Sequence, residues 1–146
     1  SMREDVRHVL NDGMPCLAEC GGFMYLHDEM EAMDGNSYHM AGVISGRAYR
    51  TQRLNRFGYV TLTQKKEVFG MNDMGGIPAH EFHYFDSENC GDDFDAKKPA
   101  SHRKWNCIHG TDTMMAGFPH LYFYGNPKVP EAFLRKCSQY GRQDAR

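Results

Sequence analysis

Cys20, followed by two glycines, stands in the middle of an apolar stretch that covers residues 15–26. A short apolar run ends at the cysteine and apolar residues at helical spacing resume at Phe23, so the order predicts a strand, a sharp turn and a helix. A nucleophile at such a turn needs small residues two positions before and after it, because the backbone passes close to itself there. Ala18 and Gly22 meet this need, which makes Cys20 a candidate nucleophile. The alternative is a buried structural cysteine beside a helix start.

The expected helix also bears on the chemistry of the cysteine. Unpaired N–H groups and the dipole at a helix N-terminus favour negative charge, so this position is expected to favour the thiolate of Cys20.

Length and charge narrow the classes of protein to consider. The 146 residues predict roughly one domain with room for a hydrophobic core. A net charge of −2 gives no electrostatic signature for nucleic acid or an acidic membrane. No run approaches the ~18–20 apolar residues of a membrane span, and no signal peptide is recognisable. Five cysteines without C-x-x-C spacing, and no N-x-S/T sequon, favour a reducing cytoplasm.

Patterning along the chain predicts alternating helices and strands. Helices are expected at 3–10, from the elbow to about 33, and at 130–139. Strands are expected at 14–19, 40–44, 57–63, 79–85, 105–108 and 114–124. The polar stretch 89–101, which contains a proline, is expected to be a surface excursion. One layered α/β domain fits this order better than an all-α or all-β arrangement.

A cysteine nucleophile needs a base, and His120 is the preferred candidate among the eight histidines. It lies in a strand-like run that is expected to reach the carboxyl edge of a sheet, where active sites of α/β folds collect. An imidazole there would hold Cys20 as a thiolate and later protonate the leaving group. The alternative is a core histidine without a catalytic role. His27, His39, His102 and His109 are expected at the surface.

Residues 80–84 form a second polar cluster, His-Glu-Phe-His-Tyr. On a strand, Glu81 and His83 share one face. The run lacks the i,i+4 histidine spacing of H-E-x-x-H, so a polar network that lines a pocket is favoured over zinc, and no metal site is predicted. The chain also has no recognisable nucleotide-binding glycine loop.

Three segments in order, 18–22, 79–84 and 118–123, read Ala-Glu-Cys-Gly-Gly, Ala-His-Glu-Phe-His-Tyr and Phe-Pro-His-Leu-Tyr-Phe. Together they resemble the C-terminal glutamine amidotransferase domain of cobyrinic acid a,c-diamide synthase, over about residues 6–133. The resemblance implies a three-layer, flavodoxin-like class I glutamine amidotransferase fold, truncated at its N-terminus, so that residues 1–146 are part of one domain.

By this resemblance, Cys20 attacks the side-chain amide of glutamine and His120 raises its nucleophilicity. The backbone at Gly21 and Gly22 forms the elbow and stabilises the oxyanion. An acid is expected two residues after the histidine in the wider class, but Tyr122 stands there. Either a Cys-His dyad suffices or another acid supports the imidazole, and Glu81 is the candidate, with His83 beside it.

The resemblance also implies partners outside this chain. Ammonia would pass to a synthetase domain that uses ATP and Mg²⁺ to amidate the a and c carboxylates of cobyrinic acid in cobalamin biosynthesis. The chain itself is expected to carry no cofactor. Because a missing oxyanion donor typically costs ~10²–10³ in rate, the isolated chain is expected to hydrolyse glutamine poorly or not at all. The alternatives are another cysteine hydrolase on the same scaffold (a peptidase or γ-glutamyl hydrolase) and an inactive regulatory module.

Overall fold

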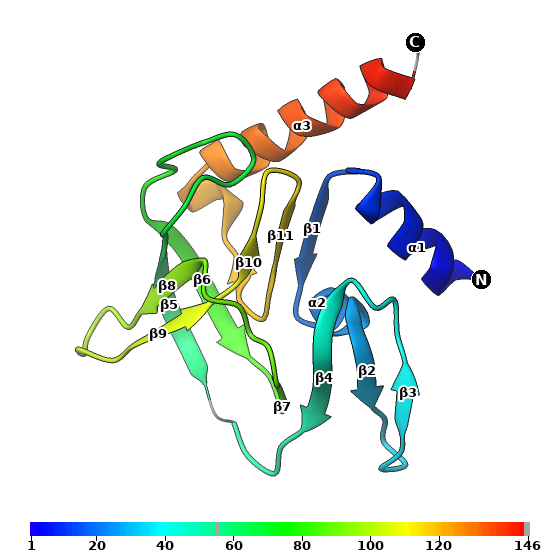
Figure 1. Ribbon diagram of the computed structural model, residues 1–146. Coiled ribbons are helices and arrows are strands. Elements are labelled where there is room, and N and C mark those ends of the chain that lie inside the picture. The colour runs from blue at the N-terminus through cyan, green and yellow to red at the C-terminus, as the bar shows by residue number, and fades with distance from the viewer. Residues whose placement is uncertain (55, 145–146) are drawn as a thin grey trace.

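The computed structural model describes residues 1–54 and 56–144, which form a mixed α/β structure (Figure 1). The helices are α1 (Met2–Asn11), α2 (Gly21–Tyr25) and α3 (Lys128–Asp144), with a 3-10 turn η1 (Phe123–Gly125). The strands are β1 (Cys16–Glu19), β2 (His27–Glu31), β3 (Ser37–His39), β4 (Ile44–Arg50), β5 (Phe57–Gln64), β6 (Ile77–Phe82), β7 (Phe85–Ser87), β8 (Phe94–Lys97), β9 (Lys104–Cys107), β10 (His109–Gly110), β11 (Met114–Gly117) and β12 (His120–Leu121). The α/β class expected from the sequence is confirmed.

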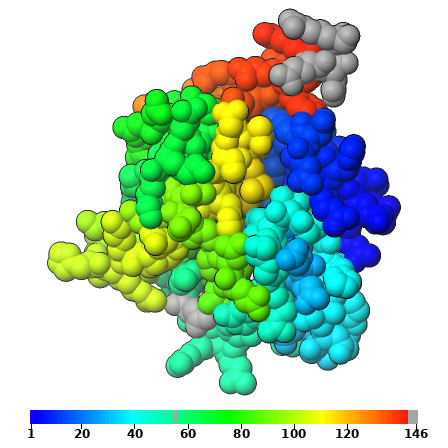
Figure 2. All heavy atoms as spheres, in the orientation of Figure 1, coloured from blue at the N-terminus to red at the C-terminus, as the bar shows by residue number. Residues whose placement is uncertain are grey.

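Among the described residues the strands form three sheets, with orders β1-β11-β10, β12-β6-β5-β8-β9 and β3-β2-β4-β7. In the first sheet β1 runs parallel to β11, and its last residue, Glu19, lies opposite Gly117. The five-stranded sheet is antiparallel throughout, whereas β2 and β4 form a parallel pair in the third sheet. In the space-filling view the segment around β10 and β11, coloured yellow, lies between the green middle part of the chain and the blue N-terminal part (Figure 2).

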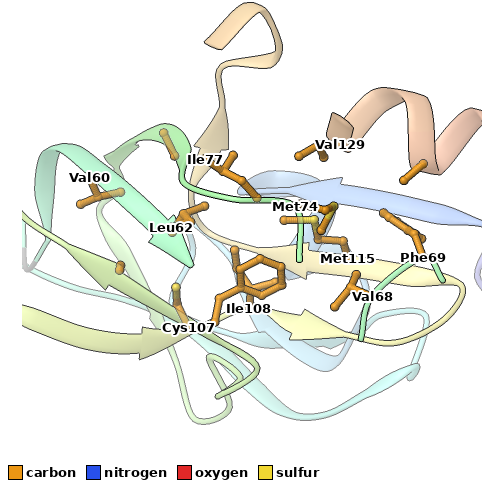
Figure 3. Packing of buried hydrophobic residues seen from close by; sticks show 14 residues of the cluster. Val60, Leu62, Val68, Phe69, Met74, Ile77, Cys107, Ile108, Met115 and Val129 are labelled. Atoms are coloured by element: carbon orange, nitrogen blue, oxygen red, sulfur yellow. The ribbon is translucent and has the colours of Figure 1, made fainter. Parts of the chain in front are cut away.

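Two hydrophobic cores meet at β11. Met115 packs into the larger one, which lies between the five-stranded sheet, the loop around Phe69 and the first turns of α3 (Figure 3). Ala116, the next residue, packs into the second core, where Phe23 of α2 is fully buried. Successive side chains of a strand point to opposite faces, so β11 is covered on both sides. The strand that leads to His120 is therefore held firmly on both faces.

Several expected elements are confirmed, with ends that differ by a few residues. They are the first helix, the strands at 14–19, 57–63 and 105–108, and the C-terminal helix, which begins at Lys128 and extends to Asp144. The expected strand 79–85 is divided between β6 and β7, and 114–124 is divided into β11, β12 and η1. No helix among the described residues is both long and apolar enough to cross a membrane.

Three expectations are wrong. The elbow helix does not reach residue 33 but ends at Tyr25, because residues 27–31 pair with both β3 and β4 as strand β2. The expected strand 40–44 is a loop up to Val43, and the strand begins only at Ile44. The stretch 89–101 is not merely a surface excursion, because it contains β8, whose two inward side chains are fully buried in the larger core.

Candidate active site

Cys20 connects the end of β1 to the start of α2 in a backbone conformation that side-chain-bearing residues rarely adopt. Its φ is 48° and its ψ is −104°. Its N–H donates to the carbonyl of Gly117 at 2.9 Å, and its own carbonyl accepts the N–H of Met24 at 2.9 Å. One side of the residue is thus tied to the β11 strand and the other to the helix. Strained conformations of this kind persist only where the surroundings fix them, and they cluster at active sites.

The small residues around the cysteine lie as the turn requires. A Cβ placed on Gly22 would be 3.7 Å from the Cβ of Ala18, which is ordinary van der Waals contact. The space between Ala18 and Gly22 would therefore take one added methyl group and little more. The predicted strand, turn and helix around Cys20 are confirmed as local structure.

The surroundings of the thiol do not ionise it by themselves. Burial raises the pKa of Cys20 above its ordinary value, and the carboxylates of Glu19 and Glu81 raise this pKa further. The N–H of Gly21 donates toward the sulfur and lowers the pKa, but its effect is smaller than that of burial. The raised pKa of Cys20 contradicts the expectation that the helix start favours a thiolate, and a base is needed to remove the proton.

His120 lies close to the residue that precedes Cys20 in the chain. It is the first residue of β12, it is half exposed, and its Nδ1 lies 3.4 Å from Oε2 of Glu19, the residue directly before the cysteine. In the β12–β6 ladder His120 lies opposite His80. Directly opposite residues of an antiparallel pair point to the same face of the sheet, so the two histidines share the outer face of β6.

Glu81 and His83 lie on the other side of the sheet, and both are buried. His83 Nε2 is 3.4 Å from Glu81 Oε2, its Nδ1 is 2.6 Å from the carbonyl oxygen of Phe85, and its ring stacks on Phe118 with centroids 4.0 Å apart. The predicted shared face of Glu81 and His83 is confirmed. The structure places Glu81 against His83, on the face of β6 opposite to that of His80 and His120.

His27 was expected at the surface, and this is wrong. Its side chain is fully buried, with Nδ1 3.0 Å from the carbonyl oxygen of Phe23 and Nε2 2.6 Å from Oγ of Ser87. Burial is the main cause that lowers the pKa of His27. In the sequence, the position of His27 four residues after the apolar Phe23 is the signal that could have indicated its burial.

A groove of about 610 Å³ opens beside His120. Tyr59 and His80 line one part of it and Tyr122 another, and its surface is mostly apolar. A second crevice, of about 790 Å³, lies between α1 and the third sheet and is lined by none of the candidate residues. Within the described part of the chain, no three His, Cys, Asp or Glu side chains are placed to hold a metal ion.

Comparisons with known proteins identify the family of the chain. Residues 1–127 match a family described as the CobB/CobQ-like glutamine amidotransferase domain. The cobyrinate a,c-diamide synthase of Caldanaerobacter subterraneus subsp. tengcongensis is 33% identical over 98% of this chain and 32% of its own length. The proteins of the same name from Fusobacterium nucleatum subsp. nucleatum and Picrophilus torridus are 36% and 34% identical, over 89% and 94% of this chain and 29% of each relative.

The chain thus spans about a third of the length of these curated relatives. The family match covers both the Cys20 turn and the strand that begins at His120. The chain belongs to the CobB/CobQ-like glutamine amidotransferase domain family.

Proposed function

We propose that this chain hydrolyses glutamine, with Cys20 as the nucleophile and His120 as the general base and acid. The observation that carries the proposal is the strained strand-to-helix turn at Cys20, with the His120 imidazole beside the residue that precedes it. The family of the chain supplies the substrate class, since its members are glutamine amidotransferase domains.

In the proposed reaction, the Cys20 sulfur attacks the side-chain amide carbon of glutamine as His120 takes the thiol proton. The N–H of Gly21, which lowers the pKa of the Cys20 thiol, is proposed to stabilise the negative oxygen of the tetrahedral intermediate, with that of Gly22 next to it. The C–N bond then breaks, and the amide nitrogen leaves as ammonia with the proton from His120. Water attacks the remaining thioester, which releases glutamate and restores the thiol.

The raised pKa of Cys20 makes the base important. A buried thiol that holds its proton cannot attack an amide unless the proton is transferred in the same step or just before it. His120 is the proposed base, and its Nδ1 lies 3.4 Å from the carboxylate of Glu19, the residue directly before the cysteine.

The ammonia is proposed to serve the reaction that the relatives are named for, the formation of the a,c-diamide of cobyrinate. By the resemblance, ATP and Mg²⁺ would be used in a synthetase domain of the longer relatives. The residues of this chain do not fit either group, because the sequence has no phosphate-binding loop and the described residues contain no metal-ligand cluster. Ammonia release is therefore the part of the overall reaction assigned to this chain.

The experiment that tests the proposal is alkylation by 6-diazo-5-oxo-norleucine, a reactive analogue of glutamine. We expect mass spectrometry to find the label on Cys20, glutamine to slow the labelling, and Cys20→Ser to abolish it. A Cys90→Ser variant is the matched control and should be labelled like the wild type. The analogue needs only the first half of the reaction, so slow overall turnover of the isolated chain does not obscure the result.

Two results would contradict the proposal. One is a label on another cysteine, and the other is labelling of Cys20 that glutamine does not slow, which would favour a different cysteine hydrolase. The role of His120 is tested by His120→Asn, which we expect to slow labelling by about 10²–10⁴-fold.

A further inference from the structure

The chain lacks an acid two residues after His120, where Tyr122 stands with its side chain largely exposed. The structure supplies a carboxylate at the imidazole from a different place. Oε2 of Glu19 lies 3.4 Å from Nδ1 of His120, although the two residues belong to different sheets. Glu19 ends β1 and is followed at once by Cys20, so one short segment holds both the carboxylate and the thiol.

We propose that Glu19 is the positioning residue that orients the His120 imidazole toward Cys20. This inference rests on the proposed function of Cys20 and His120. A carboxylate beside Nδ1 accepts the hydrogen of that nitrogen, which fixes the tautomer and leaves Nε2 with a lone pair. The unprotonated Nε2 is then the atom that accepts the thiol proton.

The strand register explains why Glu19, and not Glu81, fills this role. His120 lies opposite His80 in the β12–β6 ladder, so the two point to the outer face of β6. Glu81 follows His80 directly and points to the buried face, where its Oε2 meets His83. Glu19 reaches the imidazole from the end of β1, because β1 pairs with β11 and the chain continues from β11 to His120.

Glu19 acts on the cysteine in two opposite ways, and the sign of the net effect tests the proposal. Its negative charge raises the pKa of Cys20 directly, so a neutral residue at position 19 would by charge alone produce more thiolate and faster alkylation. Loss of the oriented imidazole would make alkylation slower. A glutamate that is only a nearby charge therefore predicts acceleration, whereas a positioning residue predicts slowing.

The test uses Glu19→Gln, which keeps the shape of the side chain and removes its charge. At pH 7.5 we expect alkylation of Cys20 by 6-diazo-5-oxo-norleucine to slow by about tenfold or more, below the ~10⁴ that a wrong tautomer costs in a serine protease. Glu19→Asp should recover part of the rate. The matched control is Glu29→Gln, which removes the charge of a partly exposed glutamate 3.8 Å from His39, and it should react like the wild type.

A second measurement reads the imidazole directly and does not depend on alkylation. Nitrogen-15 NMR should show His120 with its hydrogen on Nδ1 in the wild type, with the signal assigned by its loss in His120→Asn. In Glu19→Gln the hydrogen should shift toward Nε2, while the other histidine signals stay in place.

Faster alkylation of Glu19→Gln with an unchanged tautomer would overturn the inference and leave the proposed function standing. An unreactive Cys20 in the wild type would instead overturn the proposed function, and the NMR measurement would still show whether Glu19 sets the tautomer of His120.

Discussion

Replacing Gly117 by alanine should disturb the elbow from the strand behind it. A Cβ at this position would lie 2.6 Å from Cγ1 of Ile108 and 3.2 Å from its Cα. Carbon atoms pack at about 3.5–4.0 Å, so the two segments must separate by roughly 1 Å. Ile108 is buried and cannot turn outward into solvent. We expect Gly117→Ala to lower the free energy of unfolding by about 1–3 kcal/mol, the usual range for an overpacked core.

The same shift should reach the nucleophile. The carbonyl of Gly117 accepts the N–H of Cys20, and Gly117 lies opposite Glu19 in the ladder. A misplacement of about 1 Å at a reacting group can cost on the order of 10² in rate. Labelling of Cys20 by the glutamine analogue should therefore slow in Gly117→Ala, in a protein that urea titration and circular dichroism show to be folded.

Gly22→Ala is the matched control on the other side of the elbow. Its added Cβ would meet only Ala18, at 3.7 Å, and alanine is favoured over glycine in a helix by roughly 0.5–1 kcal/mol. We expect this variant to be as stable as the wild type or slightly more stable. Equal stability of the two alanine variants would refute the reasoning.

A double-mutant cycle tests the cause of the Gly117 effect. Ile108→Ala removes the Cγ1 atom that lies closest to the new methyl group. The double variant should then be less destabilised than the sum of the two single variants by about 1 kcal/mol or more. Strict additivity would place the strain somewhere other than at this contact.

Two further predictions concern other buried groups. Burial raises the pKa of the Cys107 thiol well above its usual range. Iodoacetamide at pH 8 should therefore modify Cys20 long before Cys107, and unfolding in urea should remove the difference in rate. Equal rates of modification in the folded protein, measured by mass spectrometry, would contradict this. Burial lowers the pKa of His27 in the folded state, so the unfolded chain binds more protons. The free energy of unfolding should therefore fall as the pH drops through the unfolded pKa of about 6.5, by at most about 1.4 kcal/mol per pH unit. Urea midpoints between pH 7.5 and 5.5 should show a shallower pH dependence in His27→Gln, and identical slopes would rule out His27 as the cause.

The local features of the site could be predicted from the amino-acid pattern. The strand, turn and helix around Cys20 follow from small residues at fixed distances from the cysteine, which is a steric condition met within five residues. Glu81 and His83 are two residues apart and both are buried, as the alternation of side chains along an extended segment predicts. The ordered motifs also placed the chain in its family.

Which side chains come into contact depends on long-range pairing of the strands. The helix after Cys20 stops at Tyr25 because the next residues gain two strand partners, one of them β4, and helical periodicity over a few residues does not report such partners. The carboxylate beside His120 depends on the pairing of β1 with β11 and of β12 with β6, since register sets the face to which each side chain points. Contacts between segments distant in sequence are fixed by such pairings, so the choice between Glu19 and Glu81 could not be made from local pattern.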